Sequence, residues 1–295
     1  MSTSNLTLPN FLVIGAYKSG TTSVHHYLQQ HPQIYVPQLK EPNFFAFENG
    51  ANADHPAVAT AVTTMSEYRR LFAGVRDEIA VGEVSPEYLA NPEAPARIRT
   101  CLPDVRLIAI LRNPVERAYS DFLMYRRNGE EPFADFGRAL DQQEDRYRRR
   151  QSTGYYVRTG FYAEQLARYF DLFPSTSINV YLFEDLVRDP GAVMDEIFYF
   201  LGVDVLDVPS LEQRNVSGEP RNALVAFALR SRRWAMPVLG ILPDRARPKI
   251  EGLVQRGLRR PALPRDQRAR LQELYRDDIL TLASLIGRDL SHWLE

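Results

Sequence analysis

Apolar residues in this chain occur in short, nearly continuous runs that alternate with longer stretches of helical spacing. The short runs are rich in β-branched residues and end at turn or cap residues, which is typical of buried strands. They lie at Phe11–Ile14, Ile79–Val81, Val105–Leu111 and Ile178–Phe183. The helical stretches lie at 23–30, 91–100, 113–125 and 161–170. This alternation predicts an α/β fold of three layers, with a central parallel sheet flanked by helices.

The pattern changes after Gly202, where strand signals stop and helical stretches continue to the end of the chain. We therefore expect a helical C-terminal region. No Pro/Gly/Ser-rich linker or block of charge divides the 295 residues, and 44% apolar content is enough for one large core. The sequence predicts a single domain over residues 1–295.

Charge is balanced overall but not along the chain. The formal net charge is −1, so no global positive field indicates a nucleic-acid partner. Residues 230–270, however, carry twelve Lys or Arg and three Asp or Glu. That excess fits either a solvated helical face or a surface for an anionic acceptor or lipid. The polar N-terminus has no secretory pattern and no run reaches the ~18 apolar residues of a membrane span, so we expect a cytoplasmic protein.

The loop after the first predicted strand is almost a nucleotide P-loop. It reads Gly15-Ala16-Tyr17-Lys18-Ser19-Gly20-Thr21-Thr22 between a strand and a helix. Such a turn directs backbone N–H groups and the positive end of the helix at an anion. In the nucleotide-binding pattern G-x-x-x-x-G-K-[ST] the lysine follows the second glycine, whereas here Lys18 stands three residues upstream of that position. The loop therefore suits a phosphate group, but its lysine is not placed as in the usual nucleotide-binding loop.

A second departure from the NTPases lies at the end of the third predicted strand. An NTPase needs an acidic residue near this place to hold magnesium, but the strand ends in Arg112. A guanidinium repels a metal ion and binds an anion bidentately. The pattern favours a nucleotide with an additional phosphate and no obligatory metal.

These residues resemble the sulfotransferases that use 3′-phosphoadenosine 5′-phosphosulfate (PAPS). The family's K-[ST]-G-T-T loop, which takes the 5′-phosphosulfate, matches Lys18-Ser19-Gly20-Thr21-Thr22. Its second motif, an arginine at a strand end and a serine eight residues later, takes the 3′-phosphate and matches Arg112 and Ser120. The segment 215–221 stands where the family has a loop that closes over the nucleotide. There the resemblance implies donor contacts by Ser217, Gly218 and Arg221.

The resemblance is closest to the carbohydrate, heparan-sulfate-like branch and its bacterial relatives. In that branch the catalytic glutamate precedes an aromatic pair, which matches Glu41 before Phe44-Phe45 and implies that Glu41 is the general base. Lys18 would then stabilise the oxygen that links the sulfuryl group to phosphate. A plainer interpretation of Glu41 is that it pairs with Lys40.

Three histidines compete for the role of base, since aryl- and steroid-type sulfotransferases use one. His25 and His26 are adjacent on the first predicted helix, so at most one of them faces the site. His31 precedes Pro32 at the end of that helix. None stands at a later strand end, where the histidine-using branch would place it.

The acceptor is less defined. Several heparan-sulfate relatives have a lysine where this chain has Val84, so either Glu83 with a basic residue elsewhere substitutes or the acceptor differs. Tyr155, Tyr156 and Arg158 fit either sugar stacking or ordinary packing. An anionic sugar or glycolipid is a candidate acceptor, and the sequence does not indicate an oligomeric state.

We therefore expect sulfuryl transfer from PAPS to a hydroxyl of a carbohydrate-like acceptor, directly and in line, without a metal. One alternative is a P-loop kinase or NTPase with a rearranged lysine. Another is a nucleotide-binding protein that has lost catalysis, although such a protein would have no chemical use for Glu41.

Overall fold

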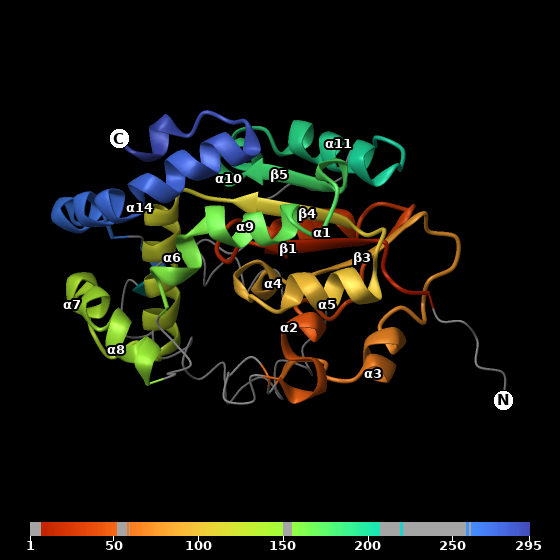
Figure 1. Ribbon diagram of the computed structural model, residues 1–295, viewed down its shortest axis with the longest axis horizontal. Coiled ribbons are helices and arrows are strands. Elements are labelled where there is room, and N and C mark those ends of the chain that lie inside the picture. Colours follow the sequence, from red (N-terminus) through yellow and green to blue (C-terminus); the bar gives the residue numbers. More distant parts are fainter. Residues whose placement is uncertain are drawn as a thin grey trace. The chain divides into compact units, whose positions relative to one another are not determined.

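The computed structural model describes residues 7–51, 58, 60–149, 155–206, 219–220, 258–259 and 261–295 (Figure 1). The chain divides into two compact units. The first consists of Met1–Asn113, Phe161–Arg214 and Arg276–Glu295, and the second of Pro114–Gly160 and Asn215–Tyr275. The single domain over 1–295 stays a prediction.

The first unit contains a five-stranded sheet in the order β2-β3-β1-β4-β5. Its strands are β1 (Phe11–Gly15), β2 (Ile34–Tyr35), β3 (Ala80–Val84), β4 (Arg106–Leu111) and β5 (Ile178–Leu182). The strand pairings of this sheet are parallel, and β1 lies between β3 and β4. The four predicted strands are confirmed within a few residues. The short strand β2 was missed, because a two-residue strand carries no periodicity.

The first unit also contains a series of helices, several of which pack on this sheet. They are α1 (Thr21–Leu28), α2 (Phe44–Phe47), α3 (Met65–Arg70), α4 (Glu87–Ala90), α5 (Ala94–Cys101), α9 (Tyr162–Phe170), α10 (Phe183–Arg188) and α11 (Pro190–Leu201). Three of them match predicted stretches, namely α1, α5 and α9. Their buried positions recur with helical spacing, as in Tyr162, Leu166 and Tyr169 of α9.

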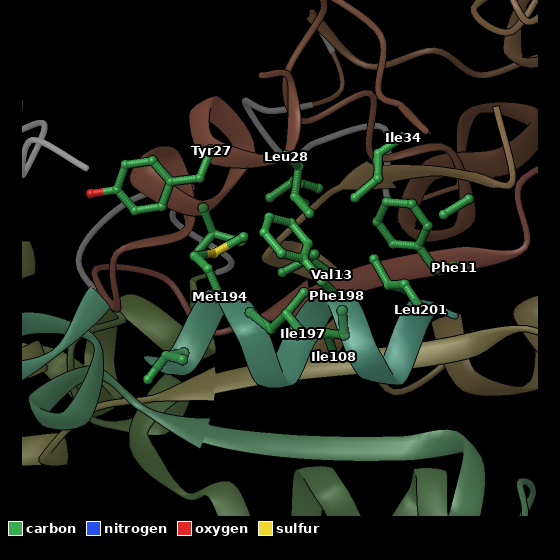
Figure 2. Close-up of a cluster of buried hydrophobic side chains, with 14 of the residues drawn as sticks. Phe11, Val13, Tyr27, Leu28, Ile34, Ile108, Met194, Ile197, Phe198 and Leu201 are labelled. Atoms are coloured by element: carbon green, nitrogen blue, oxygen red, sulfur yellow. The ribbon is translucent and has the colours of Figure 1, made fainter. Parts of the chain in front are cut away.

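Both faces of the sheet are buried. On one face, Phe11 and Val13 of β1 and Ile108 of β4 pack against α1 and α11 in one hydrophobic cluster (Figure 2). The residues that alternate with them, such as Leu12 and Leu107, are also fully buried. Helix α4 contacts β1 and in turn α5 and α9. Burial of both faces explains the continuous apolar runs of these strands, and the predicted three-layer α/β fold is confirmed.

The described part of the second unit is mainly helical. It contains α6 (Pro114–Asn128), α7 (Phe136–Asp141), α8 (Gln143–Arg148), the strands β6 (Glu219–Pro220) and β7 (Leu258–Arg259), and the first part of α14 (Arg265–Ile286), which ends in the first unit. Helix α6 runs three residues beyond its predicted end. Helix α14 agrees with the predicted helical C-terminus. The prediction that strands stop after Gly202 is wrong, because β6 and β7 form an antiparallel pair; runs of two residues leave no readable pattern.

Aromatic side chains build the interior of the second unit. Phe122 of α6 packs against Phe136 of α7 with ring centroids 4.9 Å apart, and against Tyr156 at 5.9 Å. A buried ion pair lies beside them, in which Arg146 donates to both oxygens of Glu131 at 2.6 and 2.9 Å. Bidentate geometry of this kind compensates the desolvation of both charges.

Candidate active site

The loop between β1 and α1 has the backbone that the sequence predicts for anion binding. Lys18 has φ 64° and Gly20 has φ 84°, both in the left-handed region. Gly20 is the N-cap of α1, and a glycine has no side chain with which to cap the helix. The first-turn N–H groups therefore face the loop rather than a capping side chain.

Side chains of this loop are partly withdrawn from solvent. Ser19 and Thr21 are buried, whereas Lys18, Gly20 and Thr22 are partly exposed. A Cβ at Gly20 would come within 3.1 Å of Leu186 and Phe183, so the glycine is required by space as well as by its φ. A backbone cradle at a helix N-terminus with one lysine on it fits a phosphate or phosphosulfate group.

Arg112 joins the end of β4 to this loop. It follows Leu111, the last residue of the strand, and is 8% exposed. Its Nη1 donates to the carbonyl of Lys18 at 2.9 Å, and its guanidinium lies 4.6 Å from the ring centroid of Phe183. The two predicted donor motifs are thus in direct contact in the first unit, although 94 residues separate them.

Glu41 lies at the same edge of the sheet. Its backbone N–H donates to the carbonyl of Val84 at 3.1 Å, which places it over the last residue of β3. Because β3, β1 and β4 are adjacent and parallel, their carboxyl ends meet at one edge. Lys18, Glu41 and Arg112 each follow or cover one of these ends.

The Glu41 side chain forms an ion pair with Lys40, as the plainer interpretation expects. The Glu41 side chain is 34% exposed. Salt bridges at partly exposed positions contribute little to stability, so this pair opens at small cost and leaves the carboxylate able to accept a proton. Phe44 and Phe45 are buried and pack on Tyr68, with 4.5 Å between the centroids of Phe44 and Tyr68.

A buried carboxylate beside this segment was almost overlooked by sequence reasoning, which named Glu83 only as a substitute for the missing lysine. Glu83 is fully buried near the end of β3. It accepts hydrogen bonds from the hydroxyls of Ser85 at 2.6 Å, Tyr88 at 2.6 Å and Tyr68 at 3.3 Å. Burial raises the pKa of Glu83 to about 7, although the three hydroxyls and Lys40 act in the opposite direction. The available signal was an acidic residue inside an otherwise apolar strand.

Val84 belongs to the hydrophobic cluster of the first unit and is 1% exposed. Its side chain therefore serves the core, while its carbonyl holds the N–H of Glu41. An apolar core contact therefore stands at the position where the resemblance to the heparan-sulfate branch implies a lysine.

His31 and His25 each lie against a backbone carbonyl. The N–H of Gln33 donates to Nδ1 of His31 at 3.1 Å, so Nε2 of His31 carries the proton that it donates to the carbonyl of Asp204 at 2.9 Å. Nε2 of His25 lies 3.0 Å from the carbonyl of Pro37, and burial lowers the pKa of His25. His26 is partly buried on α1.

The remaining predicted residues are Ser120 and three residues of the segment 215–221. Ser120 is fully buried on α6. Ser217, Gly218 and Arg221 lie outside the described residues, as does most of the basic region 230–270.

The suggested acceptor residues separate into two kinds. Tyr156 is fully buried and donates to Glu131, so it belongs to the packing of its unit. Tyr155 and Arg158 instead lie against the ring of Tyr147, with the guanidinium 3.4 Å from its centroid.

The sequence of residues 9–207 matches that of the Sulfotransferase family. This chain belongs to the sulfotransferase family. The match decides against the kinase or NTPase alternative. It spans the loop at Lys18, the base candidate Glu41 and the motif at Arg112, and it confirms the family that these motifs suggested.

A bacterial sulfotransferase shares the whole architecture. The chain is similar to the crystal structure of a sulfotransferase from Alicyclobacillus acidocaldarius, with a TM-score of 0.77 and 31% identity over 98% of this chain and 100% of that one.

Two human sulfotransferases are also similar. The chain is 28% identical to heparan sulfate glucosamine 3-O-sulfotransferase 6 over 95% of this chain and 72% of that protein. It is 27% identical to bifunctional heparan sulfate N-deacetylase/N-sulfotransferase 3 over 97% of this chain. It spans only 31% of the length of that bifunctional protein.

No helix that the structure describes is both long and apolar enough to cross a membrane. Within the same residues, no three His, Cys, Asp or Glu side chains are grouped so that they could hold a metal ion.

Proposed function

We propose that this protein transfers the sulfuryl group of PAPS to a hydroxyl of a carbohydrate or carbohydrate-like acceptor. The observation that carries the proposal is the contact of Arg112 with the carbonyl of Lys18. It joins a phosphate-type loop to an arginine at the strand end where an NTPase would have its magnesium-binding acid.

The donor site in this proposal is centred on the loop of α1. Lys18, Ser19, Gly20, Thr21 and Thr22 would hold the 5′-phosphosulfate through backbone N–H groups, hydroxyls and the ammonium group. Arg112 and Ser120 would hold the 3′-phosphate. Ser217, Gly218 and Arg221 would close over the nucleotide.

PAPS supplies an activated sulfuryl group joined to phosphate through a bridging oxygen. Glu41 would accept the proton of the acceptor hydroxyl as the hydroxyl oxygen attacks the sulfur of PAPS. The Lys18 ammonium would stabilise the negative charge that develops on the bridging oxygen as its bond to sulfur breaks. Neither role requires a covalent intermediate on the enzyme or a metal ion.

The acceptor class is supported by similarity to the two human enzymes along nearly the whole chain. Both carry heparan sulfate in their names, which supports a sugar acceptor, and the name of the 3-O-sulfotransferase supports a hydroxyl as the group that accepts the sulfuryl group. An anionic sugar or glycolipid would suit the basic residues 230–270. A cytoplasmic location and the absence of a nucleic-acid partner stay predictions.

Calorimetric titration with adenosine 3′,5′-bisphosphate and with ATP, both without metal, tests the donor assignment. We expect tight binding of the bisphosphate and none of ATP, because only the former carries a 3′-phosphate for Arg112 and Ser120. Binding of ATP with magnesium-dependent turnover would contradict the proposal. Labelled PAPS with heparan sulfate and with a glycolipid as acceptors then tests the acceptor class.

A further inference from the structure

The proposed mechanism gives no role to the buried carboxylate of Glu83 in the first unit. Glu83 is fully buried and the hydroxyls of Ser85, Tyr88 and Tyr68 donate to its carboxylate. A buried carboxylate is costly to desolvate unless its hydrogen bonds are complete. Such an arrangement calls for an explanation beyond packing.

Two of these hydroxyls continue to the backbone of the segment Glu41–Phe45. The N–H of Asn43 donates to Oγ of Ser85 at 3.0 Å, and the N–H of Phe45 donates to the hydroxyl of Tyr88 at 3.4 Å. Each hydroxyl thus bridges Glu83 to one N–H of this segment. The hydroxyl of Tyr68 donates to Glu83 but makes no hydrogen bond to the described residues 41–45.

The same segment has an unfavourable backbone conformation that contacts with the rest of the protein must stabilise. Glu41 has φ 61° and Asn43 has φ 53°, in the left-handed region that side chains other than glycine seldom occupy. Such residues persist where surrounding structure determines their conformation. The bridges from Glu83, together with the bond from the N–H of Glu41 to Val84, supply that structure.

We propose that Glu83 is a positioning residue that holds the segment Glu41–Phe45 through the hydroxyls of Ser85 and Tyr88, and thereby sets the place of the Glu41 carboxylate. This inference rests on the proposed function, in which Glu41 is the base. It adds a residue that does not touch the substrate but determines how the base is presented.

The direction of the hydrogen bonds between Glu83, the two hydroxyls and the backbone explains why a carboxylate is needed. In its ionised form, which prevails above about pH 7, the carboxylate only accepts hydrogen bonds, so both hydroxyls donate to it and turn their lone pairs towards the N–H groups of Asn43 and Phe45. A glutamine at this position would present an amide NH₂ to one hydroxyl. That hydroxyl would then have to accept from the amide, and its own proton would lose its acceptor.

Amide hydrogen exchange of residues 40–47 in the full-length protein tests the proposal without an acceptor. We expect Glu83→Gln and Ser85→Ala to speed exchange in this segment about tenfold, because each breaks a bridge to its backbone. Tyr68→Phe is the matched control: it also removes one hydroxyl from Glu83, but none of the bridges. Unchanged exchange in the first two variants, or an equal increase in the control, would overturn the proposal.

Turnover gives a second readout. With labelled PAPS and heparan sulfate, we expect Glu83→Gln to lower kcat about tenfold with an unchanged KM for PAPS, and Tyr68→Phe to leave both unchanged. A parallel loss in the control would indicate a merely structural role. Failure of the proposed function is distinguishable: Glu41→Gln would then keep full activity, whereas the exchange result does not depend on Glu41 chemistry.

Discussion

The donor loop and the base segment lie at the same edge of one sheet but are built by different means. The donor loop, Gly15–Thr22, depends on backbone: two residues with positive φ and a helix that begins at Thr21. The base segment, Glu41–Phe45, depends on side chains from elsewhere in the chain, chiefly Glu83, Ser85 and Tyr88. Binding of a phosphate needs many N–H groups in one turn, whereas a base needs one carboxylate in one place.

This comparison predicts that variants of the two regions separate the binding of the donor nucleotide from the transfer of its sulfuryl group. Changes in the donor loop affect both donor affinity and turnover. Changes in the base segment affect turnover alone.

The largest expected effect is that of Glu41→Gln. Removal of a general base lowers kcat by roughly 10²–10⁴-fold, and the amide keeps the shape of the side chain. Affinity for adenosine 3′,5′-bisphosphate, measured by calorimetry, is expected to stay at the wild-type value. Full transfer activity in this variant would show that another group is the base.

Lys18→Ala is expected to lower both the rate of transfer, kcat, and the affinity for adenosine 3′,5′-bisphosphate. Loss of a charged donor from the developing negative charge costs about 10²–10³-fold in kcat, and the same ammonium attracts the phosphosulfate. Calorimetry should therefore show weaker bisphosphate binding in this variant than in Glu41→Gln. Equal affinities in the two variants would remove the distinction between the regions.

The buried Glu83 predicts a pH-dependent stability. Its pKa is raised from 4.5 to about 7 in the folded protein, so between these values the folded state binds the proton more tightly than the unfolded chain. The free energy of unfolding should fall as pH rises through this window, by at most about 3 kcal/mol. Denaturant unfolding at several pH values measures it.

In Glu83→Gln that part of the pH dependence should be absent. The difference between the two proteins isolates Glu83 from other groups that titrate in the same range, such as Asp278, whose pKa burial raises to about 6. Identical pH profiles would mean that Glu83 does not titrate in this window.

The smallest expected effect is that of Gly20→Ala. A side chain at φ 84° costs about 1–2 kcal/mol of stability, and the new Cβ lies 3.1 Å from Leu186 and Phe183. Gly50→Ala is the control, since Gly50 has φ 74° but open space around its Cβ. We expect both variants to lose stability in thermal unfolding and only Gly20→Ala to lose affinity for the bisphosphate. If both variants lost affinity, the effect could not be attributed to the loop that contains Gly20.

Sequence reasoning succeeded where the signal is local. The strands at Phe11 and Arg106 and the loop after the first of them could be predicted, since a buried strand, a glycine turn and a helix start depend on near neighbours. It failed for β2 and for the β6-β7 pair, whose two residues per strand have no pattern of their own. The roles of His25 and His31 were likewise open, because their partners are carbonyls of Pro37 and Asp204.

The sequence by itself determined the family and indicated the proposed donor loop and the proposed base, because each is a short run of residues with a fixed backbone or chemistry. Only the tertiary structure decided that Arg112 contacts the loop of Lys18, and that Glu83 reaches the backbone beside Glu41 through Ser85 and Tyr88. The physical reason is distance along the chain: hydrogen bonds between side chains and remote backbone exist only after strands β1, β3 and β4 have aligned their carboxyl ends.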